Sequence, residues 1–152
     1  MLRFDFTGLA ESEGEFADTN FSSNVSDIVS AARFLESEYK APEILIGHSL
    51  GGAAMFVAAR DIPSAKAVST IGAPCDPSHI AHILSGHEEE LEKHGEVEVS
   101  IGGRPFRLKK QFLDDVKEAE TCAAIHDLKR ALLRSEERRV GKECRVRWRR
   151  DE

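Results

Sequence analysis

The first apolar pattern along the chain has helical spacing. Asn24 is a good N-cap residue, Asp27 follows it three residues later in a capping-box-like arrangement, and Pro42 marks the end of the segment. The spacing therefore predicts a helix that begins at Asn24. Its single apolar stripe comprises Val25, Ile28, Val29, Ala32 and Leu35.

Three other segments have the pattern of strands. Residues 1–6 are predicted to form a first strand, the apolar run 44–46 a second, and Ala67–Ile71 a third that Gly72 and Pro74 close. An alanine-rich helix over residues 52–60 separates the last two. Strands that alternate with helices predict an α/β fold with a parallel sheet, right-handed crossovers and both sheet faces covered.

The pattern changes after Pro74. Short helices are expected over residues 77–84 and 88–94, and an amphipathic helix over residues 112–119. Between them, a Gly102-Gly103 turn predicts a hairpin that pairs Val99 with Phe106 and Val97 with Leu108. Residues 75–127 are therefore expected to form a helix-hairpin-helix insertion. It is either a cap over the carboxyl edge of the sheet, where α/β folds bind ligands, or a surface decoration.

Residues 128–133 resemble the start of a fourth strand that breaks off at Arg134. We therefore divide the chain into a core at 1–74, the insertion at 75–127, the strand start at 128–133, and a basic tail at 134–152. The tail carries a net charge of +3 and the rest −9, within a total of −6. This acidic body argues against nucleic-acid binding.

Composition narrows the class of protein further. The 152 residues suffice for one domain with a core, and no apolar run approaches the ~20 residues of a membrane span. No signal sequence opens the chain, so a cytoplasmic location and no membrane partner are expected. Cys75, Cys122 and Cys144 suggest reduced thiols, and their spacing predicts neither a metal site nor a cofactor. Composition leaves the oligomeric state open.

The pentapeptide Gly47-His48-Ser49-Leu50-Gly51 carries the strongest chemical signal. It matches G-x-S-x-G between a strand and a helix, which is the setting of a nucleophile elbow. Ser49 is the predicted nucleophile, and the backbone N–H of Leu50 the predicted oxyanion donor. Gly47 and Gly51 are expected to be small because a side chain there would collide with the neighbouring strand or helix. The alternative is a glycine-rich turn without chemistry.

A serine nucleophile needs a base and an orienting acid. His48 should point away from Ser49 and pack locally, and Asp76 is a weak candidate for the acid because it also suits the cap of a helix before Pro77. Cys75 has no evident base beside it. His79 and His82 could line the cleft, and His87 and His94 are expected to be solvated. His126 is expected to be a surface or packing residue.

Three segments resemble the α/β-hydrolase family: residues 2–12, the elbow at 47–52, and residues 71–74. They are most similar to bacterial-type serine hydrolases, some of which carry a second, peroxide-reducing domain of the OsmC type. Relatives often have glycine where this chain has Ala10. The resemblance implies a fold of eight strands, with the triad acid and histidine further along the sequence than this chain extends. The chain is therefore expected to be an internal fragment. The tail resembles vector or assembly contamination, the alternative being a native basic segment for an acidic partner.

The resemblance implies a serine hydrolase that cleaves a small-molecule ester, thioester or amide through an acyl-enzyme on Ser49. The isolated chain is expected to be almost inactive, because the triad acid and histidine are missing from it. Two alternatives remain. One is a non-catalytic binding module with the same fold, and the other an auxiliary part of a peroxide-handling OsmC-type fusion.

Overall fold

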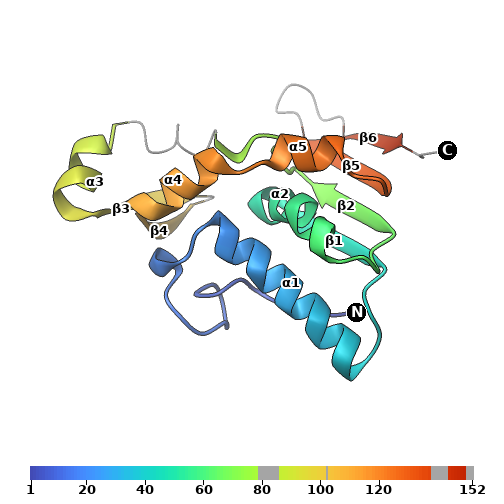
Figure 1. Ribbon diagram of the computed structural model, residues 1–152. Coiled ribbons are helices and arrows are strands. Elements are labelled where there is room, and N and C mark those ends of the chain that lie inside the picture. Colours follow the sequence, from blue (N-terminus) through green and yellow to red (C-terminus); the bar gives the residue numbers. More distant parts are fainter. Residues whose placement is uncertain (79–85, 102, 138–143, 150–152) are drawn as a thin grey trace. The chain divides into compact units, whose positions relative to one another are not determined.

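The computed structural model of the chain describes residues 1–78, 86–101, 103–137 and 144–149 (Figure 1). The chain divides into two compact units. We call Met1–Asp27 with Pro77–Ala119 the hairpin unit, and Ile28–Asp76 with Glu120–Glu152 the sheet unit. The division falls within helix α1 (Phe21–Glu38), between Asp27 and Ile28.

The sheet unit contains the predicted parallel α/β arrangement. Its strands are β1 (Ile44–His48), β2 (Ala67–Ile71), β5 (Ala131–Glu137) and β6 (Cys144–Arg149), in the order β1-β2-β5-β6. The first three pair in parallel and β6 pairs antiparallel to β5. Helix α2 (Ser49–Ala58) connects β1 to β2, with a short 3-10 turn, η2 (Ala59–Asp61), behind it. The predicted α/β class and the strand–helix–strand unit are confirmed.

Only one face of β1 and β2 is buried. Leu45 on β1, and Val68 and Thr70 on β2, lie inward, and α2 contributes Ala53, Ala54, Phe56 and Ala58 to the same core. On the opposite face, Ile44, Ile46 and Ile71 remain 62%, 60% and 51% exposed. The expectation that both faces would be covered is therefore wrong for these strands among the described residues. We call Ile44, Ile46 and Ile71 the open face.

Helix α1 starts earlier than predicted. Asn20 caps it: the Ser23 N–H donates to Asn20 Oδ1 at 2.7 Å, and the Asn20 N–H donates to Ser23 Oγ at 2.9 Å. Asn24, the predicted cap, is buried instead, and Asp27 accepts from the Thr7 N–H and hydroxyl at 3.0 Å each. The local signal was misplaced because Asn20 and Ser23 form the same reciprocal pair one turn earlier.

The predicted strand over residues 1–6 is wrong. Phe6 is half-buried, whereas Met1, Leu2 and Phe4 are exposed, and no ladder includes residues 1–6 in the part of the chain that the structure describes. A strand exists only through hydrogen bonds to a neighbour. The apolar pattern of residues 1–6 was therefore not sufficient to form a strand. In the loop that follows, Ala10 has a φ of +49°, the left-handed region that favours glycine.

The hairpin unit is built around β3 (Glu96–Ile101) and β4 (Arg104–Lys109). The predicted pairs are confirmed: Val97 lies opposite Leu108 and Val99 opposite Phe106. The Phe106 ring meets the edge of Phe16, from the 3-10 turn η1 (Phe16–Asp18), at 5.4 Å between centroids. Val97, Val99 and Leu108 are buried, and so this hairpin has one apolar face as predicted.

Three helices complete the described elements. α3 (Glu88–His94) agrees with its prediction. α4 (Lys110–Glu118) begins two residues before the predicted amphipathic helix and ends one residue before its predicted end, and it buries Phe112, Leu113 and Val116. α5 (Thr121–His126) was not predicted. Most of the helix expected over 77–84 lies outside the described residues. A membrane-spanning helix is not found among the described helices, none of which is both long and apolar enough.

Strand β5 corrects the predicted end of the core. It was expected to break off at Arg134, but it continues to Glu137 and pairs with β2, with Thr70 opposite Arg134 and Ile71 opposite Ser135. The Gly72 N–H donates to the Ser135 carbonyl at 2.8 Å. Backbone pairing tolerates charged residues wherever their side chains reach a polar partner, so residue type alone was a poor guide to the strand end.

Candidate active site at the strand–helix turn

The turn between β1 and α2 has no connecting loop. β1 ends at His48 and α2 begins at Ser49. Ser49 is exposed and has a φ of +52°, which few residues other than glycine adopt. For an L-residue this left-handed conformation costs about 1–2 kcal/mol. The turn thus holds a serine in a strained conformation at an accessible point, as predicted for a nucleophile elbow.

Two glycines allow the strand and helix to approach this closely. A Cβ on Gly47 would lie 2.7 Å from the Gly51 carbonyl oxygen and 2.7 Å from the Gly52 Cα. A Cβ on Gly52 would lie 2.6 Å from the Ala73 Cβ and 3.0 Å from the Gly47 carbonyl oxygen. The expected steric demand is therefore confirmed at Gly47. Gly52 belongs to the predicted elbow segment 47–52, but its close contact with Ala73 was not predicted.

The start of α2 offers hydrogen-bond donors beside Ser49. The first N–H groups of a helix have no intrahelical acceptor, and the helix dipole favours negative charge there. His48 occupies the N-cap position and its side chain makes no capping hydrogen bond. The Leu50 N–H lies in this first turn. Its position is compatible with the predicted oxyanion donor, whose role stays a prediction.

His48 lies on the open side of β1. The burial along β1 alternates, with Leu45 and Gly47 buried and Ile44, Ile46 and His48 exposed. Because side chains alternate along a strand, His48 shares a face with Ile46, whereas α2 covers the other face. His48 is exposed rather than packed as expected, and its exclusion as the base stays a prediction. In the part of the chain that the structure describes, no hydrogen bond joins Ser49 Oγ to a histidine.

His126 is the other histidine described in the sheet unit. Its Nδ1 lies 2.9 Å from Asp127 Oδ1, and Asp127 in turn lies 3.9 Å from Arg60, just past the C-terminal end of α2. The hydrogen bond from His126 lowers the pKa of the Asp127 carboxyl below its usual value. Ser49 lies at the opposite end of this ten-residue helix, about 15 Å away at the usual rise per residue. His126 is therefore a surface residue, as predicted.

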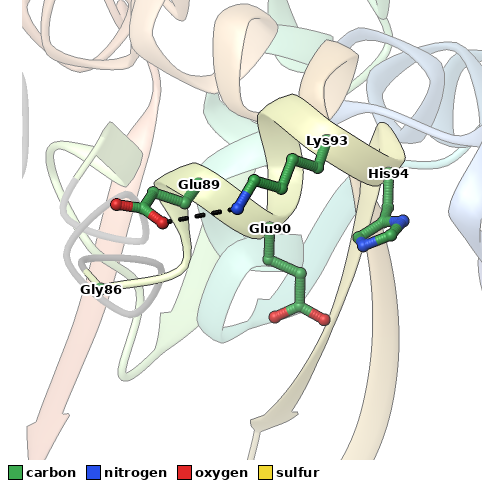
Figure 2. Close-up of a pocket in the computed structure, with 5 residues that line it drawn as sticks. All are labelled: Gly86, Glu89, Glu90, Lys93 and His94. Carbon is green, nitrogen blue, oxygen red and sulfur yellow. Dashed lines mark ion pairs between the residues drawn. The ribbon is translucent and has the colours of Figure 1, made fainter.

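Four further histidines remain, two in the hairpin unit and two outside the described residues. His87 and His94 belong to the hairpin unit, where His87 Nδ1 lies 3.3 Å from Glu90 Oε2. His94 lines an open hollow of about 530 Å³ on α3, where Glu89 and Lys93 form an ion pair at 3.7 Å (Figure 2). His79 and His82 lie outside the described residues.

Asp76 follows β2 at the same edge of the sheet as Ser49. The two strands are parallel neighbours, so their carboxyl ends, and the segments after them, meet at one edge. Ala73 from this segment is buried against Gly52, and Arg134 Nη2 donates to the Ala73 carbonyl at 3.4 Å. Asp76 is exposed. Its use as the triad acid stays a prediction.

A metal centre is not indicated. Among the described residues, no three or more histidine, cysteine, aspartate or glutamate side chains gather closely enough to hold an ion. The chemistry available at the turn is thus that of a strained serine hydroxyl beside helix N–H groups, which suits attack on a carbonyl carbon.

The chain is similar to known proteins in sequence and in fold. No protein-family model matches the chain. It is 30% identical over 132 residues to a curated mouse (Mus musculus) protein, "Palmitoyl-protein thioesterase ABHD10, mitochondrial", covering 82% of this chain and 42% of that protein. It is also similar to the solved esterase domain of a Rhodothermus marinus protein, with 44% identity and a TM-score of 0.61, covering 87% of this chain and 50% of that one.

The chain thus spans about half of each protein it matches or less. Within that span, the similarity includes both sequence and fold. The parallel sheet, the strained serine between β1 and α2, and the two similarities together place this chain in the α/β-hydrolase superfamily.

Proposed function

We propose that Ser49 is the nucleophile of a serine hydrolase that cleaves a small-molecule ester, thioester or amide. The observation that carries this proposal is the φ of +52° at an exposed serine between a strand and a helix, with Gly47 and Gly52 in close contact behind it. Backbone strain on non-glycine residues clusters at active sites and ligand-binding sites. The two similar proteins, a thioesterase and an esterase domain, support the same class of reaction.

The reaction would follow the order of serine acyl transfer. Ser49 Oγ attacks the carbonyl carbon of the substrate while a base takes the hydroxyl proton. The developing oxyanion accepts a hydrogen bond from the Leu50 N–H at the start of α2. The leaving group takes the proton and departs, which leaves the acyl group on Ser49. Water, activated by the same base, then releases the acid and restores the serine.

The base and the acid of this proposal are not identified among the described residues. His48 lies on the open side of β1 and His126 at the far end of α2, so neither suits the role. Loss of a catalytic base typically leaves only the contribution of the oxyanion donors and of binding. We therefore propose that this chain alone hydrolyses substrates very slowly, and that a longer protein containing it supplies both residues.

A fluorophosphonate probe tests both statements. The purified chain, its Ser49→Ala variant and a control variant, Ser30→Ala, which removes an exposed hydroxyl on α1, are incubated with the probe. The labelled residue is then identified by mass spectrometry. We expect weak, slow labelling of Ser49 that Ser30→Ala leaves unchanged and Ser49→Ala abolishes.

Two results would contradict the proposal. Equal labelling of the Ser49→Ala variant would exclude Ser49 as the nucleophile. Rapid labelling of Ser49 in the chain itself would show that the chain already contains a base, because an unactivated serine reacts slowly with such probes. A longer protein that contains this chain and remains unlabelled at Ser49 would instead favour the non-catalytic binding module.

A further inference from the structure

Two cysteines of the sheet unit touch where the sequence gives no reason to expect it. Cys122 Sγ lies 3.0 Å from the carbonyl oxygen of Cys75, and both residues are exposed and unbridged. They are 47 positions apart in the sequence. Cys75 precedes, and Cys122 follows, the whole 77–119 segment of the hairpin unit.

The helix that carries Cys122 is held firmly. In α5, Thr121 and Ala124 are buried on either side of Cys122, and the helix packs against α2. Arg60, just after α2, pairs with Glu120 at 3.4 Å and with Asp127 at 3.9 Å, which are the residues flanking α5. Cys122 is thus an exposed thiol on an anchored helix.

The segment that carries Cys75 is held by contacts of the residues just before it. Ala73 is buried against Gly52, and its carbonyl accepts a hydrogen bond from Arg134. Gly72 is bonded through its N–H to the Ser135 carbonyl. The backbone just before Cys75 is therefore fixed to both α2 and β5, and the main chain of Cys75 already contacts the Cys122 sulfur.

The contact places the Cys122 sulfur at the residue that would be its disulfide partner. A bond between them requires the two Cβ atoms to lie about 3.5–4.5 Å apart. The Cys122 side chain is already directed at the Cys75 backbone, and the Cys75 Cβ is two bonds from the carbonyl carbon it approaches. The Cys75 thiol is exposed, so rotation about its Cα–Cβ bond is open to it.

We propose that Cys75 and Cys122 form a reversible disulfide that peroxide makes and thiols reduce. One thiol attacks an oxygen of hydrogen peroxide, breaks the O–O bond and becomes a sulfenic acid as the other oxygen leaves in water. The second thiol attacks the sulfenic sulfur, forms the S–S bond and releases a second water. Two thiols are oxidised and one peroxide is reduced to two waters.

The disulfide would join the points where the chain leaves and re-enters the sheet unit. A cross-link stabilises mainly by restricting the unfolded chain, the more so for a long loop. The bond would close a loop that contains all of residues 76–121. It would also fix the segment after β2 that packs on the glycine behind Ser49. The proposal concerns the thiols alone and does not depend on hydrolase activity.

The test uses the whole chain with Cys144→Ser, so that only the two cysteines remain. Reduced protein is treated with one equivalent of hydrogen peroxide, alkylated and digested with trypsin. We expect tryptic peptide 67–93 joined to peptide 118–129, two hydrogens lighter than their sum, and its loss on treatment with dithiothreitol. Oxidation should raise the Tm of this variant, and not that of a Cys122→Ser, Cys144→Ser variant.

The same oxidation in urea serves as the reference. Native protein should convert a larger share of its oxidised thiols into the Cys75–Cys122 bridge than unfolded protein does, because the fold holds the second thiol beside the sulfenic acid. An equal share in both states would overturn the proposal. So would a product dominated by sulfinic acids or by bridges between two molecules, since either shows that the native thiols do not meet.

Discussion

Gly52 and Ala73 lie so close that a Cβ added to Gly52 would fall 2.6 Å from the Ala73 Cβ. This contact joins the first turn of α2 to the segment after β2, and it holds the elbow against the sheet. The two clashing atoms are both Cβ atoms, which are attached directly to the backbone and cannot rotate away from each other. The clash can be relieved only by moving backbone or by removing the Ala73 methyl group.

We therefore expect Gly52→Ala to lower the free energy of unfolding by about 1–3 kcal/mol, the usual cost of overpacking. Adding Ala73→Gly should recover part of this loss, because it removes the atom that the new methyl group meets. Urea denaturation of the two single variants and the double variant gives the coupling energy. Strictly additive losses would show that Gly52 is required for another reason.

Ser49 offers a second test of the strained turn. Its φ of +52° costs a serine or alanine about 1–2 kcal/mol that glycine largely avoids. Ser49→Gly should therefore be more stable than Ser49→Ala by about 1 kcal/mol, after the greater flexibility of the unfolded glycine chain is allowed for. Both variants should fail to label with the fluorophosphonate probe. Chemical denaturation decides, and a more stable alanine variant would contradict the observed backbone conformation.

Ala10 has the same kind of backbone strain in the loop of the hairpin unit. Its φ is +49° and its side chain is exposed, so the methyl group adds strain without burial. Ala10→Gly should raise the free energy of unfolding by up to about 1 kcal/mol. Thermal or urea denaturation measures the change. A matched Ala123→Gly variant, at an exposed position within helix α5, should instead be destabilised.

Because the open face exposes apolar side chains, we expect the chain to associate with copies of itself. Ile46→Thr should reduce light scattering on heating while changing the unfolding free energy little, because Ile46 is 60% exposed. Leu45→Thr is the control one position away. Leu45 is buried, and so its replacement should destabilise the chain by about 2–3 kcal/mol. Unchanged scattering after Ile46→Thr would show that the open face does not drive association.

Glu43 links stability to pH at the start of the sheet. Its carboxylate lies 3.1 Å from Lys66 Nζ and 3.3 Å from Lys40 Nζ, and these ammonium groups lower its pKa from 4.5, Lys66 foremost. A carboxylate whose pKa is lowered in the folded state stabilises the fold at pH values above its unfolded pKa. This stabilisation is lost as the pH falls through the folded pKa. Unfolding free energies of the native chain and Glu43→Gln should thus differ slightly at pH 7. The difference should close below pH 4.5; a gap that widens there would contradict the pairing.

The elements with a clear period were predictable, and the caps were not. The alternation of Val97 and Val99 with polar residues, followed by two glycines, specified the β3–β4 register residue by residue. Asn24 was a reasonable cap by type, but Asn20 and Ser23 make the reciprocal bonds. Two adjacent segments with equivalent capping chemistry cannot be ranked without knowing which turn the apolar stripe can bury.

The sequence alone determined the elbow, because G-x-S-x-G between an apolar run and an alanine-rich helix is a local pattern. Only the tertiary structure decided which contacts support it. The left-handed φ of Ser49, the lack of room for a methyl group between Gly52 and Ala73, and the Cys75–Cys122 contact are all features of the folded chain. The missing strand at residues 1–6 and the open face of β1 have the same origin. Periodicity encodes which side of an element is apolar, whereas pairing and burial depend on a neighbour that distant parts of the chain must supply.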